Sequence, residues 1–378
     1  MWKKRSDRRV RNGLAASVPI GRLCGPGSGD PEGRMQPEIG GQCMRIVFMG
    51  TPDFAVGALE AVVRAGHQVI AAVTQPDKPK GRGKGVQMPP VKQCALKYGI
   101  PVFQPVKIKE PEAVEILRGY EADIFVVAAF GQLLSEEILT MPKYGCVNIH
   151  ASLLPKYRGA SPIQWVILNG EKETGITVMQ MDKGLDTGDM LMKCTVPLEE
   201  KETGASLHDK LRDAGAKLIA EALPKIERGE LKPEKQREEE ATYFSLLKKS
   251  FGQMDWTKDA VSLDRLVRGL NPWPSAYTYY HGKTLKIWEC EPAAEENTRQ
   301  GQPESGEPEK VCKYAQDGGG TGRIEKVTKE AFYVRTGNGL LKVLQVQLEG
   351  KKRMRVKDFL LGCPLAEGDI LGSGEAEF

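Results

Sequence analysis

Residues 44–73 read MRIVFMGTPDFAVGALEAVVRAGHQVIAAV, and this stretch decides the fold class. Residues 45–49 are predicted to form a buried strand, because 46–49 are all apolar, and a glycine follows them directly. Thr-Pro-Asp at 51–53 supplies capping and first-turn residues for a helix, and apolar residues recur at helical spacing over 54–66. A second buried strand follows at 69–73. Strand, helix and strand in this order predict a right-handed βαβ unit of a parallel sheet.

The same alternation continues along the chain and predicts a Rossmann-like α/β domain over residues 44–228. The further elements that we expect are helices at 89–98, 110–118, 132–139 and 204–228 and strands at 123–128, 146–149, 174–181 and 189–196. The first strand is followed by Gly-Thr-Pro-Asp and not by G-x-G-x-x-G, so the turn that cradles a dinucleotide phosphate is missing. We therefore expect no NAD.

Composition changes mark the other parts of the chain. Residues 1–43 are basic and then rich in glycine and proline, which predicts a disordered extension or a start codon assigned too far upstream. Residues 229–245 are strongly polar and predict a linker. Short alternating stretches over 246–372 predict a smaller OB-like β-barrel domain, with a flexible insertion at 291–322 that is rich in Glu, Gly and Pro. A short tail, 373–378, follows.

Charge and cysteine content restrict the class of protein. The formal net charge of +4 over 378 residues is too small to indicate a nucleic-acid partner by itself. No apolar run is long enough to cross a bilayer, so we expect no membrane association. The eight cysteines form no Cys-x-x-Cys pair, which favours a reducing, cytoplasmic setting without structural zinc. We expect a monomer.

The chemistry is concentrated where the strand at 146–149 ends. Asn148 and His150 are two positions apart, so both side chains point to one face of the sheet, at the edge where open α/β sheets bind ligands. A carboxamide can stabilise an oxyanion and an imidazole can relay a proton, which is what acyl transfer to an amine requires. Each of the other histidines has an ordinary structural interpretation.

A carboxylate near the imidazole would fix its tautomer. Asp182, Asp186 and Asp189 are equal candidates by spacing, and all three could simply be turn residues. Spacing alone does not decide among them.

Three separated motifs resemble the signature of the folate-dependent formyltransferases. They are Asn148-x-His150, Ser-Leu-Leu-Pro at 152–155 with Tyr-Arg-Gly at 157–159, and Gly-Leu-Asp-Thr-Gly at 184–188. The resemblance implies that Asn148, His150 and Asp186 are the catalytic residues, and that no metal takes part. It also implies that 10-formyltetrahydrofolate, the formyl donor, is contacted by Ser152, Leu153, Leu154 and Pro155.

Further motifs are similar to those of the methionyl-tRNA formyltransferases. Residues 45–56 match the start of that family, and Asn-Pro-Trp-Pro-Ser-Ala at 271–276 matches its second domain. The glycine-rich loop at 75–84 corresponds to one that enters the tRNA acceptor stem, which implies tRNA contacts by Lys78, Lys80, Arg82 and Lys84. A basic cluster at 351–357 adds positive charge in the second domain. The match runs from 44 to 372, but Ser-Phe-Gly-Gln at 250–253 and the insertion depart from the usual pattern.

The sequence therefore predicts transfer of a formyl group from 10-formyltetrahydrofolate to the amino group of initiator methionyl-tRNA. Two alternatives stay open. The chain could formylate a small amine, such as a glycinamide ribonucleotide or an aminosugar nucleotide. It could also be a non-catalytic tRNA- or folate-binding module, although binding alone does not require all three polar residues.

Overall fold

The computed structural model describes residues 43–79, 86–293 and 320–372. Several predictions fall outside these ranges: the N-terminal extension up to residue 42, the cations Lys80, Arg82 and Lys84, most of the predicted insertion, and the tail.

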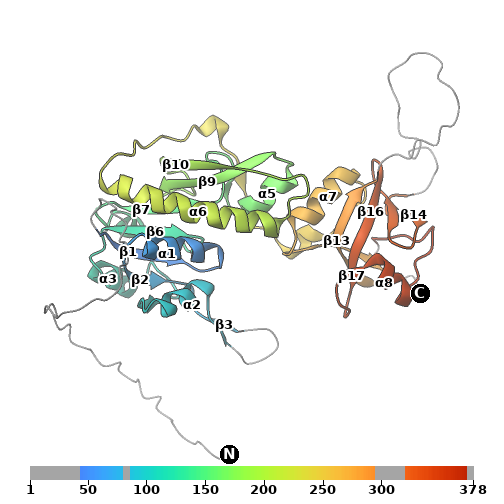
Figure 1. The fold of residues 1–378 in the computed structure, drawn as a ribbon, viewed down its shortest axis with the longest axis horizontal. Helices are drawn as coiled ribbons and strands as arrows, with labels where there is room; N and C mark the ends of the chain where they lie inside the picture. The colour runs from blue at the N-terminus through green and yellow to red at the C-terminus, as the bar shows by residue number, and fades with distance from the viewer. Residues whose placement is uncertain (1–42, 80–85, 294–319, 373–378) are drawn as a thin grey trace, which may run out of the picture. The chain divides into compact units, whose positions relative to one another are not determined.

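The first domain is built on a seven-stranded sheet in the order β10-β9-β7-β6-β1-β2-β5 (Figure 1). Its strands are β1 (Arg45–Gly50), β2 (Gln68–Val73), β5 (Val102–Phe103), β6 (Ile124–Ala128), β7 (Cys146–His150), β9 (Glu173–Gln180) and β10 (Met190–Pro197). Its helices are α1 (Phe54–Arg64), α2 (Pro90–Lys97), α3 (Pro111–Gly119), α4 (Glu136–Leu139), α5 (Pro162–Leu168) and α6 (Gly204–Glu227). A short ribbon is formed by β3 (Lys78–Pro79) and β4 (Val86–Gln87).

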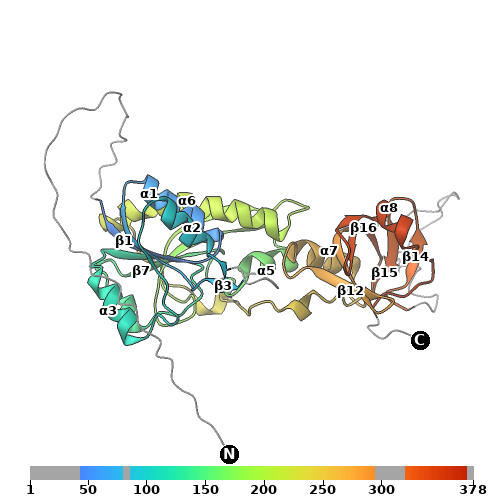
Figure 2. The same cartoon turned by 90° about the horizontal axis from the view of Figure 1, so that it is seen from below.

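Strand alternation divides the core into two layers. Ile46 and Phe48 of β1 pack with residues of α1, α2 and α6, whereas Val47 and Met49 pack with residues of α3 and α4. Figure 2 shows α1, α2 and α6 on one face of the sheet and α3 on the other. Because β1, β6 and β7 are parallel, their carboxyl ends meet at one edge of the sheet. The predicted βαβ architecture is confirmed.

The sheet departs from the simple parallel pattern at its far edge. β9 runs antiparallel to β7, and β10 runs antiparallel to β9. The predicted helix at 132–139 is reduced to the four residues of α4. Gln132, in the part of the prediction that is not helical, binds another loop, its Oε1 accepting from the backbone N of Ile108 at 2.8 Å. A helix that sequence periodicity missed, α5, precedes β9.

The second domain is an antiparallel sheet with two helices. Its elements are η2 (Lys249–Gly252), α7 (Ala260–Gly269), β12 (Ala276–Tyr280), β13 (Lys283–Pro292), β14 (Ile324–Val327), β15 (Phe332–Arg335), β16 (Leu340–Leu348), β17 (Met354–Arg355) and α8 (Val356–Gly362). The strand order is β12-β13-β16-β15-β14, with β17 beside β16. The prediction of an α/β domain followed by a smaller antiparallel β domain is confirmed. β13 extends to Pro292, so the first two residues of the predicted insertion belong to a strand.

The segment between the two domains is bound to the first domain. Within the predicted linker 229–245, η1 (Glu238–Glu240) is followed by β11 (Tyr243–Phe244), which pairs in parallel with β8 (Arg158–Gly159) of the first domain. The linker is therefore attached to the loop that follows β7. The domain limits that we derived from the sequence stay a prediction.

Candidate active site

His150 is the last residue of β7, and its side chain is almost completely buried. Its Nε2 lies 2.9 Å from the backbone carbonyl oxygen of Tyr157. A carbonyl oxygen can only accept, so Nε2 carries a hydrogen and donates it. The other ring nitrogen, Nδ1, lies 3.7 Å from Oδ2 of Asp186. Nδ1 is therefore the ring atom that is left to take up or release a proton.

The three candidate aspartates have different environments. Oδ1 of Asp182 accepts hydrogen bonds from the backbone N of Gly184 at 3.0 Å and from Thr187 Oγ1 at 2.7 Å, so this carboxylate stabilises its own turn. The backbone carbonyl of Asp189 accepts from the N of Gln180, which starts the β9–β10 pairing. Among the three, the Asp186 carboxylate is the one that lies within ion-pair distance of His150 in the described part of the chain.

Asp186 is held in an unusual backbone conformation. Its φ of +56° lies in the left-handed region, which aspartate tolerates better than most residues do. Its Oδ2 accepts a hydrogen bond from the backbone N of Gly159 at 2.9 Å. One carboxylate oxygen thus connects the loop after β9, the loop after β7 and the imidazole.

Asn148 lies two residues before His150 on β7 and is partly accessible. It is paired with Met179 of β9, so the side chains of these two residues share one face of the sheet. Its carboxamide forms no hydrogen bond with any residue that the structure describes. The amide N–H groups are therefore available to a ligand beside His150.

The Ser-Leu-Leu-Pro segment forms a tight turn next to this face. Thr177 Oγ1 donates to the carbonyl oxygen of Ser152 at 2.7 Å and accepts from the backbone N of Leu154 at 3.1 Å. The Ser152 hydroxyl is buried and donates to the carbonyl of Lys156, so it serves the turn. Leu154 is also buried, whereas Leu153 and Pro155 are partly exposed. The peptide bond between Leu154 and Pro155 is cis.

A cavity of about 390 Å³ opens beside this turn. Leu153, Leu154 and Pro155 line one side of it, and Met190 packs with Leu154 and Met179 at its floor. The remaining lining residues are charged: Lys156, Lys193, Glu234, Lys235, Arg237 and Glu240. Met179, which packs with the lining residues Leu154 and Met190, is the partner of Asn148 in the sheet, but the trio itself does not line the cavity. Cations outnumber anions at its rim, which suits an anionic ligand.

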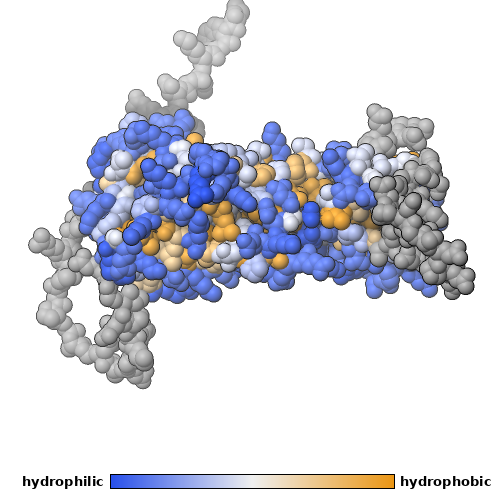
Figure 3. Space-filling view, turned by 90° about the horizontal axis from the view of Figure 1, so that it is seen from above, coloured by the Kyte–Doolittle hydropathy of each residue, from blue (hydrophilic) through white to orange (hydrophobic). Residues whose placement is uncertain are grey.

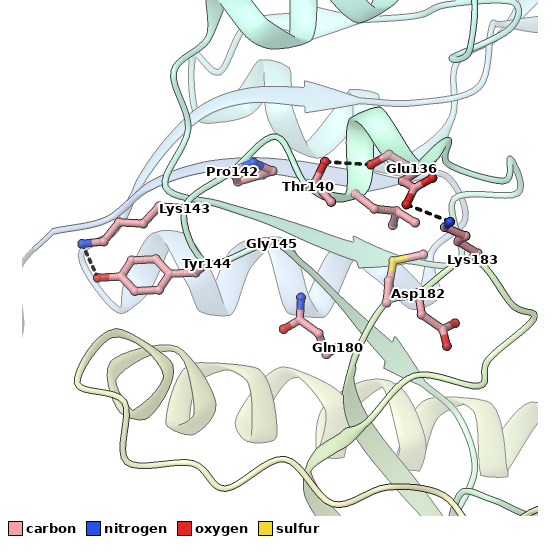
Figure 4. Close-up of a pocket in the computed structure, with 11 residues that line it drawn as sticks. Glu136, Thr140, Pro142, Lys143, Tyr144, Gly145, Gln180, Asp182 and Lys183 are labelled. Atoms are coloured by element: carbon pink, nitrogen blue, oxygen red, sulfur yellow. Dashed lines mark hydrogen bonds and ion pairs between the residues drawn. The ribbon is translucent and has the colours of Figure 1, made fainter.

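A second cavity, of about 540 Å³, lies at the opposite end of β7 (Figure 4). It is lined by the loop between α4 and β7 and by Gln180 and Asp182 after β9. Its cations are already paired, because Lys183 lies 2.8 Å from Glu136 and Lys143 donates to Tyr144. It contains none of the residues that the sequence singled out except Asp182.

Neighbouring loops complete the edge of the sheet. After β1, the Thr51 hydroxyl donates to the carbonyl oxygen of Phe130 at 3.0 Å, and Gln75 Nε2 donates to the same carbonyl. Leu133 in the loop after β6 and Leu185 in the loop after β9 are more than half exposed. Apolar side chains that stay exposed at a ligand-binding edge offer a surface for a flat ring. No periodicity in the sequence marks these loop residues.

Sequence reasoning gave Arg158 no role beyond its place in a motif, and it did not single out Gln236. Arg158 is completely buried, and its guanidinium binds both carboxylate oxygens of Glu238, at 2.9 and 3.0 Å. Its Nε donates to Gln236 Oε1 at 2.8 Å. An arginine in a surface-loop motif gave the only signal, and its partners lie about eighty positions further along the chain.

Two further titratable groups lie on β7 and in the loop that follows it. Burial raises the pKa of the Cys146 thiol, at the start of β7, to about 12. Burial and a hydrogen bond to Glu171 raise the pKa of the Tyr157 phenol as well. A thiol with such a pKa stays protonated at neutral pH and is a poor nucleophile.

The predicted tRNA contacts can be placed only in part. Lys78 lies in β3, where its side chain is exposed. Asp77, beside it, accepts a hydrogen bond from Lys92 at 2.7 Å. The other three predicted cations are outside the described residues.

The described residues form neither a metal cluster nor a membrane-spanning helix. Among the residues with a described placement, no group of three or more histidine, cysteine or acidic side chains is arranged to hold a metal ion. In the same part of the chain, every helix is too short or too polar to span a bilayer. The face drawn in Figure 3 is mostly hydrophilic, with smaller hydrophobic patches between the charged side chains.

Comparison with known proteins shows which family this chain is similar to. Residues 44–223 match the family described as formyl transferase, and residues 246–364 match the formyl transferase C-terminal domain. The methionyl-tRNA formyltransferase of Agathobacter rectalis is 54% identical over 327 residues, which cover 86% of this chain and 99% of that protein. The enzyme of the same name from Lachnospira eligens is 52% identical and is covered completely.

A solved structure shows a similar fold at low identity. It is an N-formyltransferase from Helicobacter canadensis in complex with folinic acid and dTDP-3-aminofucose. It has a TM-score of 0.57 at 18% identity, over 82% of this chain and all of that one.

Proposed function

Because the chain belongs to the methionyl-tRNA formyltransferase family, we propose that Asn148, His150 and Asp186 carry the formyl transfer that defines the family. The enzyme moves the formyl group of 10-formyltetrahydrofolate to the α-amino group of methionyl initiator tRNA, for translation initiation. The observation that carries the assignment of roles is the convergence of a free carboxamide, an imidazole and a carboxylate at one edge of the sheet.

The reaction joins the methionyl nitrogen to the formyl carbon and breaks the bond between that carbon and N10 of the folate. The uncharged amine attacks, and negative charge develops on the formyl oxygen. The Asn148 N–H group donates a hydrogen bond to that oxygen, since it bonds no residue in the described part of the chain. Such a donor contributes about 10²–10³ in rate.

His150 moves the proton that the reaction displaces. The attacking amine must lose a proton and N10 must gain one, so no net proton is consumed. Nδ1 is the ring nitrogen that can accept the proton, since Nε2 is committed to the Tyr157 carbonyl. Asp186 faces Nδ1 and stabilises the imidazolium that forms during transfer. A positioned base of this kind contributes about 10²–10⁴ in rate.

The formyl donor fits the cavity beside the Ser-Leu-Leu-Pro turn. Leu153 and Pro155 present partly exposed apolar surface there, and Ser152 and Leu154 shape the turn from within. Exposed Leu133 and Leu185 offer further apolar contact. Cations at the rim match the carboxylates of a folate tail or the phosphates of tRNA.

For the tRNA we propose contact by the loop of Lys78, Lys80, Arg82 and Lys84, with the basic cluster at 351–357 guiding the phosphate backbone. Cytoplasmic location and a monomeric state are further proposals. The six cysteines in the described part of the chain are all free, which supports a reducing compartment. The domain limits 44–228 and 246–372 are also proposals, and the family matches over 44–223 and 246–364 support them.

The assay that tests the function compares acceptors. Purified protein is incubated with 10-formyltetrahydrofolate labelled in the formyl group, and with charged initiator tRNA, a glycinamide ribonucleotide or an aminosugar nucleotide. Label should appear on methionyl-tRNA alone. Label on a small amine at a comparable kcat/KM would favour the alternative enzymes, and binding without any transfer would favour a non-catalytic module.

A further inference from the structure

The side-chain amide of Gln236 makes three hydrogen bonds at the active-site loops. Its Nε2 donates to the carbonyl oxygen of Asp186 at 2.9 Å and to that of Gly188 at 2.7 Å, and its Oε1 accepts from Arg158 Nε at 2.8 Å. Carbonyl oxygens only accept and guanidinium nitrogens only donate, so these partners fix which way the amide points. All the polar atoms of the side chain are used.

The two donated bonds act on the part of the loop that carries Asp186. A residue with a φ of +56° costs about 1 kcal/mol or more in backbone strain unless its surroundings stabilise it. The Asp186 carbonyl is held by Gln236, while the Asp186 carboxylate is held by the backbone N of Gly159. These two attachments together determine where the carboxylate lies relative to His150.

Gln236 belongs to the segment between the domains, and the same segment holds the other partner of the imidazole. Tyr157, whose carbonyl oxygen accepts from His150 Nε2, donates its backbone N to Thr242 Oγ1 at 2.8 Å. The backbone N of Arg158 donates to the carbonyl oxygen of Thr242, also at 2.8 Å. Residues 236–244 therefore support both sides of the His150 ring.

Position 159 requires a glycine because the backbone of β8 approaches the backbone of β11 closely there. A Cβ there would lie 2.5 Å from the carbonyl oxygen of Phe244, and φ is +92°. Buried Arg158 also holds the segment, because its guanidinium binds Glu238 and Gln236. Specific bonds thus attach the segment, in addition to the packing of Phe244 against Tyr157 and Trp165.

From this network we propose that Gln236 is a positioning residue of the reaction, which holds the Asp186 carboxylate opposite His150 through the loop backbone. The segment 236–244 then forms part of the active site as well as connecting the two domains. The inference rests on the proposed role of Asp186 and extends it to a residue outside the first domain.

The test uses Gln236→Glu in the full-length enzyme. The new carboxylate still accepts from Arg158, but it has no hydrogen to donate and repels the carbonyl oxygens of Asp186 and Gly188. We expect kcat to fall by about 10- to 100-fold, as for an active-site group displaced by roughly 1 Å, with KM for both substrates changed less than threefold. Glu239→Gln is the matched control, since Glu239 lies in η1, is exposed and forms no hydrogen bond or ion pair with any residue that the structure describes. It should leave kcat unchanged.

A double-mutant cycle distinguishes positioning from a general structural role. In an Asp186→Asn background, measured under single-turnover conditions with enzyme in excess, Gln236→Glu should lower the rate less than twofold. The same fall in both backgrounds would overturn the proposal. If Asp186→Asn alone retained full activity, the proposed function of the site would fail instead.

A spectroscopic measurement serves where the rates are too low to compare. The ring ¹⁵N resonances of His150 in Gln236→Glu should move toward their positions in Asp186→Asn, and Glu239→Gln should not move them. Unchanged His150 resonances in a folded Gln236→Glu enzyme would reject a positioning role.

Discussion

Oδ2 of Asp186 lies 3.7 Å from Nδ1 of His150, and it accepts a hydrogen bond from the backbone N of Gly159 at 2.9 Å. The first distance is longer than a hydrogen bond, so the carboxylate acts on the ring mainly through its charge in this state. The ring keeps its orientation from the Tyr157 carbonyl at 2.9 Å. Orientation and charge stabilisation are thus supplied by two different loops.

Replacing the imidazole should stop turnover while binding persists. We expect His150→Ala to lower kcat by about 10²–10⁴-fold, because the proton relay is lost, with little change in the Kd for either substrate. His281→Asn is the matched control, since His281 lies in an exposed hairpin turn at φ +47°, a conformation that asparagine tolerates. Steady-state rates and tRNA binding measured side by side check this. A His150→Ala enzyme with normal turnover would remove the imidazole from the mechanism.

Replacement of the Asn148 carboxamide gives a more specific prediction, because aspartate has nearly the same shape as asparagine. Asn148→Asp should lower kcat by about 10²–10³-fold, since a carboxylate cannot donate to the developing oxyanion and repels it. We expect kcat to fall less in Asn148→Ala than in Asn148→Asp, because alanine removes the donor without adding a charge. The opposite order of the two rates would show that Asn148 does not contact the formyl oxygen.

A methyl group at position 159 should weaken the attachment of the interdomain segment. Gly159→Ala places its Cβ 2.5 Å from the Phe244 carbonyl oxygen at a φ of +92°. We expect the free energy of unfolding to fall by about 1–3 kcal/mol more than in Gly99→Ala, and kcat to fall as well. Gly99 is the control, since it also has a positive φ but has no atom near its missing Cβ. Equal losses in the two variants would mean that the approach of β11 to β8 is not tight in solution.

Glu202 makes a pH-dependent prediction for stability. Burial by itself raises the pKa of its carboxyl group, but hydrogen bonds from Lys210 and Ser206 outweigh burial and lower the pKa below its ordinary value of 4.5. A lowered pKa in the folded state stabilises the protein above pH 4.5, and this stabilisation is lost as the pH falls through the folded-state value. Glu202→Gln should therefore cost about 1–3 kcal/mol near pH 7 and progressively less under acid conditions.

The control for this prediction is Glu199, which pairs with the same lysine, Lys210, as Glu202 does. Glu199 and Glu202 both lie 2.6 Å from Lys210 Nζ, but the Glu199 side chain is 78% exposed and that of Glu202 is 1% exposed. Glu199→Gln should change the free energy of unfolding little at any pH, because solvent screens an exposed pair. Chemical denaturation of both variants between pH 3 and pH 8 gives the comparison.

The basic residues of the loop at 75–84 should contribute to tRNA binding and not to the rate of formyl transfer. Replacing Lys78, Lys80, Arg82 and Lys84 together by alanine should raise KM for charged tRNA and leave single-turnover chemistry at saturating tRNA unchanged. The slope of log affinity against log salt should decrease by about three to four if each cation neutralises one phosphate. Lys97→Ala, at the end of α2, is the control. An unchanged salt dependence would place the tRNA elsewhere.

Much of the fold follows from local signals in the chain. The apolar runs of β1 and β2 and the helical periodicity of α1 predicted the βαβ unit, because burial requires those patterns wherever they occur. Alternation also predicted that Asn148 and His150 share a face, since that depends only on strand geometry. The sequence left the three aspartates equal, and only a resemblance selected Asp186.

Tertiary structure decided what depends on residues far apart in the chain. Asp186 is brought to His150 because its loop folds back over β7 and bonds Gly159 and Gln236, and those partners lie 27 and 50 positions away. No propensity or period encodes such pairings, because each depends on where another segment has already folded. The sequence by itself thus determined the domain classes and the two residues that share a strand. The third residue of the trio, the turn that shapes the cavity and the role of the interdomain segment were set by long-range hydrogen bonds.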